Sequence, residues 1–205
     1  YEQFRNLEIY DDLSKGKEKL CISQGQLIEN VILEAEKAWK GETQVDNILL
    51  TAPTGSGKSL LFQLPAIYLG KEYNLLTIVV SPLKALIVDQ VESLQELGYT
   101  RVAYASSDLS PEQKMEVYRQ VREGEIDLFY LSPELLLSYD IKHFVGERRI
   151  GLVVVDEAHT VTTWGKEFRV DYWFLGRYLT ALKQTLGYNF PLFALTATAV
   201  WNPKG

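Results

Sequence analysis

The sequence predicts an α/β fold: a doubly wound, mostly parallel sheet with helices on both faces. Short continuous apolar runs, such as LLTIVVS at 75–81, are typical of strands buried on both faces. These runs alternate with longer segments of helical period, which favours a parallel sheet. A glycine-rich segment, APTGSGKS at 52–59, stands between one such run and a helical segment. The order strand, turn, helix fits the same class of fold.

The apolar runs and helical segments give an explicit set of expected elements. We expect strands at 47–51, 75–81, 101–106, 127–131, 151–155 and 191–196. We expect helices at 24–40, 58–69, 83–97, 111–123, 141–149 and 171–186, the fourth with Ser110 as N-cap, Pro111 at its first position and Gln113 bonding back. Residues 1–20 show no clear period, so we expect them to be mostly irregular, with at most a short helix. We therefore divide the chain into an N-terminal extension, 1–22, and one domain, 23–205.

Composition bounds the class of protein. The chain has 205 residues, 46% of them hydrophobic, enough for one medium domain with a sizeable core. Its net charge of −6 argues against broad binding of polyanions. The single cysteine, Cys21, cannot form an internal disulfide, which fits a reducing compartment. No apolar run is long enough to span a membrane. Because the first residue is Tyr1, we expect a fragment or a processed product.

The segment 52–59 has the composition of a phosphate-binding loop. Glycines at 55 and 57 let backbone N–H groups converge on a phosphate and take positive φ at little cost. The following helix N-terminus adds partial positive charge. In this pattern the lysine reaches the β- and γ-phosphates, and the last hydroxyl binds Mg²⁺. The candidate nucleotide contacts are Thr54, Gly55, Ser56, Gly57, Lys58 and Ser59. The alternative is an ordinary glycine turn before a helix.

A second candidate segment follows the apolar run 152–155, where Asp156 and Glu157 come directly after four aliphatic residues. A carboxylate at a strand end can hold the Mg²⁺ that neutralises phosphate oxygens, and we assign this role to Asp156 with Ser59. Glu157 is the candidate for orienting the attacking water. His159 is a third candidate, for catalysis or for coupling to other loops. The alternative is a solvated acidic strand end. The functional prediction requires this segment and the glycine-rich loop to meet at neighbouring strand ends, where they can share the metal.

Taken together, the motifs from about residue 20 to 200 resemble superfamily 2 helicases, most closely the RecQ family. The segment 54–59 resembles motif I, in which an alanine at position 52 is normal, and 156–159 (DEAH) resembles motif II. The segment 23–26 (SQGQ) is similar to motif 0, which makes Gln26 the candidate for reading adenine. The spacing from Gln26 to Lys58 indicates an insertion near 39–46. The resemblance implies a RecA-like, P-loop nucleotide-hydrolysing domain that uses ATP and Mg²⁺.

Other motifs of the same family imply contacts with a nucleic-acid strand. The segment 80–83 (VSPL), with Leu86, Asp89 and Gln90 after it, looks like motif Ia, and 131–134 (LSPE) looks like motif Ib. The implied strand contacts come from Ser81, Pro82, Leu83 and Gln90. The segment 194–199 (ALTATA) resembles motif III, in which the hydroxyls of Thr196 and Thr198 would link hydrolysis to strand contacts. A buried strand end is the plainer interpretation of that segment.

The segment 160–172 (TVTTWGKEFRVDY) is similar to the aromatic-rich loop of RecQ helicases, which senses single-stranded DNA. Trp164 and Phe168 are candidates for stacking on bases, and Arg169 for contacting phosphates or base planes. Lys166 stands where the family commonly has a histidine, and we include it among the candidate DNA contacts. The alternative is that both aromatic side chains fill space under a loop.

The resemblance implies a motor that hydrolyses ATP, moves 3′ to 5′ on single-stranded DNA and unwinds forked duplexes in the cytoplasm or nucleus. Its partner would be a second RecA-like domain carrying an arginine finger, beyond Gly205, so we expect the present chain alone to be nearly inactive. Two other functions remain open. One is a different P-loop enzyme, such as a small kinase, and the other is a nucleotide-gated nucleic-acid-binding module without catalysis.

Overall fold

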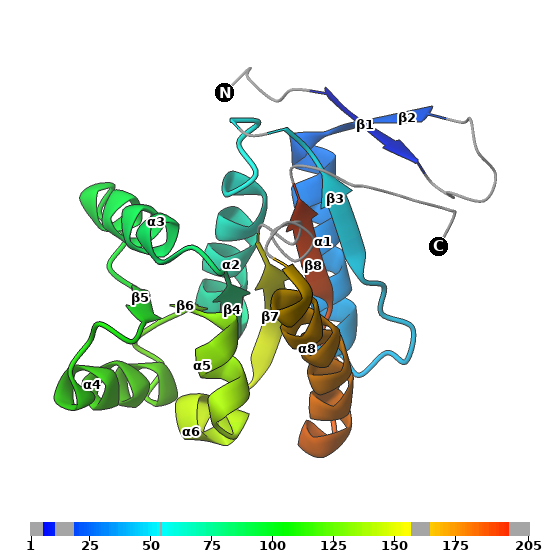
Figure 1. Ribbon diagram of the computed structural model, residues 1–205. Helices are drawn as coiled ribbons and strands as arrows, with labels where there is room; N and C mark the ends of the chain where they lie inside the picture. The colour runs from blue at the N-terminus through cyan, green and yellow to red at the C-terminus, as the bar shows by residue number, and fades with distance from the viewer. Residues whose placement is uncertain (1–5, 11–18, 54, 157–164, 197–205) are drawn as a thin grey trace.

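The computed structural model describes residues 6–10, 19–53, 55–156 and 165–196. Within them, six strands form one sheet in the order β3-β8-β7-β4-β6-β5, and every neighbouring pair is parallel (Figure 1). The strands are β3 (Ile48–Thr51), β4 (Leu76–Val80), β5 (Val102–Ala105), β6 (Leu128–Leu131), β7 (Ile150–Val155) and β8 (Leu192–Thr196). The predicted parallel α/β fold is therefore confirmed.

Helices cover both faces of the sheet and enclose two apolar layers. On one face lie α1 (Gln24–Trp39), α2 (Leu60–Tyr73) and α3 (Lys84–Glu96). On the other face lie α4 (Pro111–Arg122), α5 (Pro133–Ser138), α6 (Ile141–Val145) and α8 (Gly165–Leu186). In β6, for example, Leu128 and Tyr130 join the first layer while Phe129 and Leu131 join the second. Every residue of β4, β6 and β7 is buried, which explains their continuous apolar sequences.

The pairing of β7 with β4 contains one irregularity that requires a glycine. The register changes between the pairs Leu76↔Ile150 and Thr77↔Leu152, so Gly151 is the extra residue. A Cβ atom at Gly151 would lie 2.7 Å from the Cβ of Leu75. The close approach of these two chains therefore excludes a side chain at Gly151, and beyond it β7 runs in regular register to Val155.

The structure confirms one predicted helix start and corrects three helix boundaries. Ser110 and Gln113 form the expected reciprocal capping box at the start of α4. Helix α2 passes the predicted stop at Gly70 and ends at Asn74, which adopts a left-handed conformation with φ 52°. Helix α6 is shorter than predicted because Gly146, with φ 59°, ends it. Helix α5 was not predicted, and α8 begins at Gly165 rather than at 171.

The prediction of mostly irregular structure over residues 1–20 was wrong at 6–10 and 19–20, which are the described residues of that range. Strands β1 (Asn6–Tyr10) and β2 (Lys19–Ser23) pair antiparallel as a separate ribbon that leads directly into α1 (Figure 1). In register, Leu7 lies opposite Ile22 and Ile9 opposite Leu20. Leu7 and Ile9 in the first segment, and Leu20 and Ile22 in the second, recur at the two-residue period of a strand. Charged neighbours obscured this short pattern.

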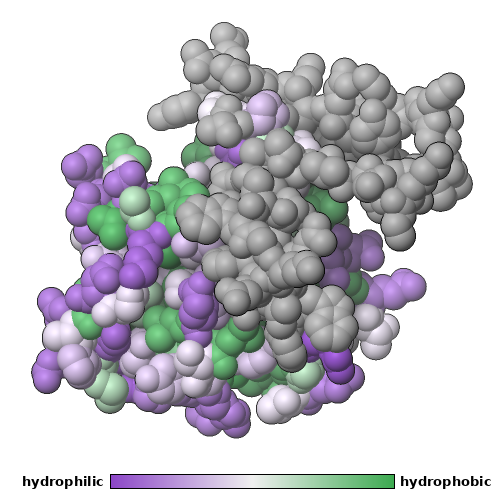
Figure 2. Space-filling view, viewed as in Figure 1, coloured by the Kyte–Doolittle hydropathy of each residue, from purple (hydrophilic) through white to green (hydrophobic). Residues whose placement is uncertain are grey.

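Hydrophilic residues cover much of the sides of α3 and α4 in the view of Figure 2, with hydrophobic residues scattered between them. None of the described helices is long and apolar enough to cross a lipid bilayer.

Candidate functional site

The candidate residues gather at the carboxyl ends of the strands, because parallel strands present these ends at one edge of the sheet. The glycine-rich loop follows β3, Thr196 ends β8, and Asp156 follows β7. The strands β3 and β7 are not neighbours, however: β8 lies between them. The expectation of neighbouring strand ends was therefore wrong by one strand. The inserted strand connects the two segments, since the backbone N–H of Ala52 donates to the carbonyl of Thr196 at 2.9 Å.

The loop after β3 has the backbone of a phosphate cradle. Gly55 and Gly57 have φ of 79° and 78°, a region that residues with side chains rarely adopt. Between them Ser56 is buried, and its hydroxyl has no partner among the described residues. The ammonium group of Lys58 donates to the carbonyls of Ala52 at 3.0 Å and Pro53 at 3.2 Å. The lysine is thus held against its own loop, with its charge satisfied by backbone oxygens.

The start of α2 leaves a hydroxyl available beside this loop. Ser59 is the residue before the helix and has helical dihedral angles, with φ −59° and ψ −38°. Its side chain forms no capping hydrogen bond, unlike Ser110 at the start of α4. The hydroxyl of Ser59 can therefore bind a ligand without breaking a helix cap, next to the partial positive charge of the helix terminus.

The first turn of α1 contacts the glycine-rich loop through a glutamine that the sequence reasoning passed over. The Nε2 of Gln24, which is 5% exposed, donates to the carbonyl of Ser56 at 2.8 Å. Gln26, the candidate for reading adenine, is exposed, and its Oε1 accepts from the backbone N–H of Ser23 at 2.8 Å in a capping box. The SQGQ segment thus lies against the loop, with Gln24 as its point of contact. The adenine contact of Gln26 stays a prediction.

Asp156 is 4% exposed and sits at the end of a buried chain of polar side chains. The Nε2 of Gln90, from α3, lies 3.5 Å from its Oδ2. The Oε1 of Gln90 accepts from the hydroxyl of Tyr130 at 2.9 Å, and that hydroxyl accepts from Gln63 of α2 at 3.3 Å. Burial raises the pKa of Tyr130, so its hydroxyl stays protonated and donates. These hydrogen bonds connect α2, β6 and α3 to Asp156, the candidate metal ligand.

The candidate strand contacts after β4 are placed unevenly. Ser81 is only 1% exposed, and its hydroxyl has no partner among the described residues. Pro82 is half-buried, whereas Leu83, at the start of α3, is 40% exposed. Gln90 points inward to Asp156 and is 9% exposed. Of this group, Leu83 lies at the surface, and the nucleic-acid contacts of the other three stay predictions.

Several predicted site residues lie outside the described residues: Thr54, Glu157, His159, Trp164 and Thr198. Lys166, Phe168 and Arg169 lie in the first turns of α8, so these positions are helical rather than part of a loop. The sequence carried this signal, since Phe168, Tyr172 and Leu175 recur at helical spacing, followed by Leu179 and Leu182.

The sequence reasoning also missed Gln63 and Tyr130. Tyr130 lies in the buried run LFYL, and a buried hydroxyl requires a partner. That requirement predicts a hydrogen bond of the Tyr130 hydroxyl but does not identify the partner. The partners come from helices about 40 and 67 positions away, so only the fold reveals them.

The residues of this edge fit a nucleotide triphosphate with Mg²⁺. The cradle offers two positive-φ glycines, a lysine and the buried, unpartnered hydroxyl of Ser56. Among the described residues, no group of three or more His, Cys, Asp and Glu could hold a metal ion. A magnesium ion bound by Ser59 and Asp156 would need phosphate oxygens to complete its ligands, as is usual for Mg²⁺ at such sites. The fold and this edge define a P-loop nucleotide-binding domain.

Comparison with known proteins narrows this class. The family model for the DEAD/DEAH box helicase matches residues 29–204, and the chain belongs to that family. It is 42% identical over 156 residues to the ATP-dependent DNA helicase RecQ of Synechocystis, covering 74% of this chain and 31% of that protein. It is 37% identical to RecQ of Bacillus subtilis, covering 75% of this chain and 24% of that protein. The chain is thus a RecQ-like helicase motor domain that spans about a quarter to a third of these relatives.

Solved structures agree on the fold. The Pyrococcus furiosus Hef helicase domain superposes with a TM-score of 0.60 at 20% identity, covering 86% of this chain and 33% of that one. The DUF1998 helicase MrfA, in a structure bound to DNA and AMPPNP, gives a TM-score of 0.62 at 20% identity, covering 99% of this chain and 28% of that one. Both are helicases, and at this identity they support the RecA-like fold alone.

Proposed function

We propose that this chain is the ATP-binding motor domain of a DNA helicase that couples ATP hydrolysis to 3′–5′ translocation on single-stranded DNA and to duplex unwinding. The observation that carries the proposal is the shared edge of the sheet. A single strand, β8, separates β3, which leads to the Lys58 loop, from β7, which leads to Asp156. The end of β8 is hydrogen-bonded to the loop. Relatives of RecQ type, named ATP-dependent DNA helicases, support the same function.

In this proposal each residue of the site has one role. The backbone N–H groups of 54–58 bind the phosphates, and Lys58 leaves its carbonyl partners to contact the β- and γ-phosphates. Ser59 and Asp156 hold Mg²⁺. When bound, the ion neutralises charge on the phosphate oxygens. Glu157 orients the water that attacks the γ-phosphate, and His159 couples the site to neighbouring loops. Gln26 reads adenine at the start of α1, beside the loop that Gln24 contacts.

The nucleic-acid side of the proposal rests on the segments that border this edge. Single-stranded DNA would contact the turn at Ser81, Pro82 and Leu83, with further contacts from Gln90, Trp164, Lys166, Phe168 and Arg169. The bond between Gln90 and Asp156 offers a physical route from α3 to the metal ligand. Thr196 and Thr198 would couple the two functions, since Thr196 is bonded to the loop after β3.

The proposal includes partners and a domain division. Residues 23–205 form the motor domain, and 1–22 form an extension. A second RecA-like domain supplies the arginine finger, so the present chain alone binds ATP weakly and turns it over slowly. The full-length protein acts on single-stranded and forked DNA inside the cell.

The test is Glu157→Gln in the full-length protein. We expect this change to abolish ATP turnover, by at least about 100-fold, while ATP binding is retained, because only the orientation of water is lost. Glu147→Gln is the control, since Glu147 is exposed and lies before β7, at the opposite end of the sheet. Turnover is measured as phosphate release and binding with a fluorescent ATP analogue.

Survival of full ATPase activity in Glu157→Gln would overturn the assignment of the water-orienting residue. A second measurement separates the motor from other P-loop enzymes. We expect single-stranded DNA to stimulate turnover and small phosphoryl acceptors to have no effect. Stimulation by a small acceptor alone would identify a kinase instead, and binding without turnover in the unmodified protein would identify a non-catalytic module.

A further inference from the structure

At the sheet edge opposite the nucleotide loop, β5 has a side without a strand partner. It pairs with β6, and among the described residues no other strand lies beside it. The carbonyl of Arg101 accepts from Asp127 and Leu128 of the β6 segment. Backbone groups of successive residues in a strand point to opposite sides, so those of Ala103 and Ala105 also face β6. The N–H and C=O groups of Val102 and Tyr104 therefore point away from β6; Val102 is buried, whereas Tyr104 is half-buried.

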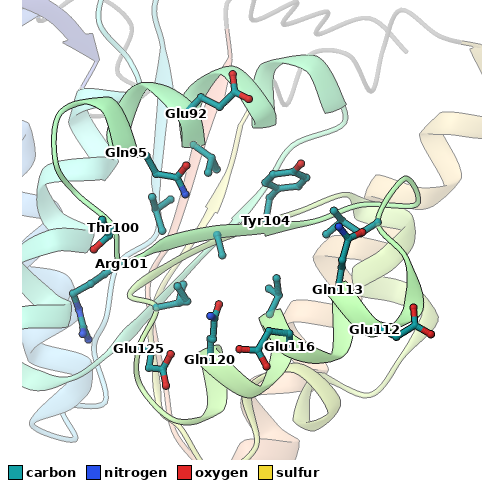
Figure 3. Close-up of a pocket in the computed structure, with 16 residues that line it drawn as sticks. Glu92, Gln95, Thr100, Arg101, Tyr104, Glu112, Gln113, Glu116, Gln120 and Glu125 are labelled. Atoms are coloured by element: carbon teal, nitrogen blue, oxygen red, sulfur yellow. The ribbon is translucent and has the colours of Figure 1, made fainter.

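This open edge is the floor of a groove with a volume of about 990 Å³. Figure 3 shows β5 running between two walls, with Glu92 and Gln95 on the α3 side and Gln113, Glu116 and Gln120 on the α4 side. Five consecutive residues, 100–104, line it. At about 3.3 Å per residue, an added strand of about five residues would span this floor.

The walls of the groove are acidic. Glu92 of α3, Glu112 and Glu116 of α4, and Glu125 before β6 line it. The basic residue in the lining is Arg101, whose guanidinium is already bonded to Asp127. Glu116 and Glu125 share Arg119, which lies outside the lining. Glu92 and Glu112, on opposite walls, form no ion pair with any described residue. Their charges are available to a cationic ligand.

We propose that the β5 edge binds an extended, basic peptide segment of a partner protein, which adds to the sheet as a further strand. The outward N–H and C=O groups of the half-buried Tyr104 supply the backbone pairing. Lysine or arginine side chains at two successive positions of the peptide reach Glu92 on one wall and Glu112 on the other, because successive side chains of a strand point to opposite faces.

The negative charge of the groove favours a basic peptide over a nucleic acid and over a second copy of this chain. A nucleic acid would bring its phosphates against four carboxylates, which is repulsive. A second copy of the chain would bring another set of the same carboxylates against this set, which is also unfavourable. A basic peptide both satisfies the strand edge and neutralises the walls. The site is at the far edge from the Lys58 loop, so a bound peptide leaves the nucleotide site open.

The test uses the full-length protein and a blocked peptide that repeats Lys-Lys-Thr-Thr, so that Lys lies on both faces, about nine residues long so that it extends past both ends of the floor. Hydrogen exchange is followed at single amides. We expect the peptide to slow exchange at Tyr104 by at least about tenfold, because this amide gains a partner. The amides of Ala103 and Ala105, already bonded to β6, should change little. A peptide that repeats Glu-Glu-Thr-Thr should have no effect.

Charge reversal supplies the matched control. The double variant Glu92→Lys and Glu112→Lys should weaken peptide binding by at least about tenfold, measured by fluorescence anisotropy. The double variant Glu29→Lys and Glu96→Lys changes the net charge equally at exposed sites outside the groove and should bind nearly as the unmodified protein does.

Four results would overturn the proposal. They are unchanged exchange at Tyr104, equal binding of the acidic peptide, equal loss of affinity in both double variants, and protection of this amide by self-association or by DNA.

Discussion

The two ends of the parallel sheet are built from different chemistry. At the amino end, Asp127 is 1% exposed and is held by two guanidinium groups, Arg101 at 2.6 Å and Arg148 at 2.8 Å. At the carboxyl end, Lys58 is held by carbonyl oxygens and Asp156 by the amide of Gln90. One end uses ion pairs that connect strands. At the other, the contacts given above come from neutral carbonyl and amide groups.

The amino-end network joins segments that are far apart in the sequence. Arg148 donates to the carbonyl of Val121 and to that of Ile126, and its Nε lies 3.3 Å from the carbonyl of Asn74. Burial lowers the pKa of Arg148, and the bond to Asp127 opposes that shift. The hydrogen bond to Asp127 raises the pKa of Arg101. We infer that this end fixes the fold, which leaves the carboxyl end able to exchange partners when a ligand binds.

The largest expected effect comes from Asp127→Asn, which keeps the side-chain volume but removes the charge. Arg148, with a side chain 4% exposed, would then be a buried cation without a counter-charge. We expect a loss of about 3–5 kcal/mol in the free energy of unfolding, measured by urea denaturation. Asp108→Asn is the control, because its carboxylate is 72% exposed beside Lys84 and should matter little. A loss of equal size in both variants would contradict the structural role of Asp127.

Lys58→Ala tests the carboxyl end of the sheet, where we expect activity rather than stability to be lost. We expect ATPase activity of the full-length protein to fall by about 100- to 1000-fold, because the charge that stabilises the developing phosphate charge is gone. Stability should change far less than in Asp127→Asn, since the bonds lost are to two neutral loop carbonyls and no buried charge is left without a counter-charge. A Lys58→Ala protein with a strongly lowered unfolding midpoint would show that this end also supports the fold.

Gly70→Ala tests how closely α2 approaches the amino-end network. In an exposed helix this change would add about 1 kcal/mol of stability through helix propensity. Here the new Cβ would lie 2.3 Å from Cγ of Asp127, so we expect a net loss of about 1–3 kcal/mol. Gly25→Ala in α1 is the matched control, because its Cβ would meet only the Ser23 hydroxyl, at 3.7 Å. Stabilisation by Gly70→Ala would contradict the packing described here.

The sequence predicted the elements better than their contacts, and the reasons are physical. Buried parallel strands have continuous apolar sequences, so all six strands of the sheet were found, and the glycine-rich loop and Asp156 were placed at their ends. Strand order depends on contacts between segments that are distant in the sequence, so the position of β8 between β3 and β7 was missed. Gly70 was taken as a helix stop because its reason, the approach of Asp127, comes from a residue 57 positions later.

Tyr130→Phe tests the series of side-chain hydrogen bonds that leads to Asp156. The change removes the hydroxyl that bonds Gln90 and Gln63 while the ring remains. We expect a loss of about 1–2 kcal/mol in stability, and a fall of about 3- to 10-fold in kcat for ATP hydrolysis with little change in KM. Tyr104→Phe is the control, because Tyr104 is the register partner of Tyr130 on β5. An unchanged kcat in Tyr130→Phe would show that these hydrogen bonds stabilise the packing but do not contribute to ATP hydrolysis.

The smallest expected effect concerns a surface bond at the amino end, between the last turns of α1 and α2. The hydroxyls of Tyr73, at 2.8 Å, and Tyr68, at 3.1 Å, donate to Glu36, and the bond from Tyr73 is the main reason that the pKa of Glu36 is lowered. Because folding lowers this pKa below its ordinary value of 4.5, the bonds stabilise the fold above that pH, and this contribution is lost as the pH falls through the folded pKa. Tyr73→Phe should therefore lower the urea midpoint slightly at neutral pH and not at all in acid, with Tyr68→Phe giving a smaller shift. A midpoint difference that persists at a pH below the folded pKa of Glu36 would assign the effect to packing of the ring, because the carboxyl group is then neutral in both states.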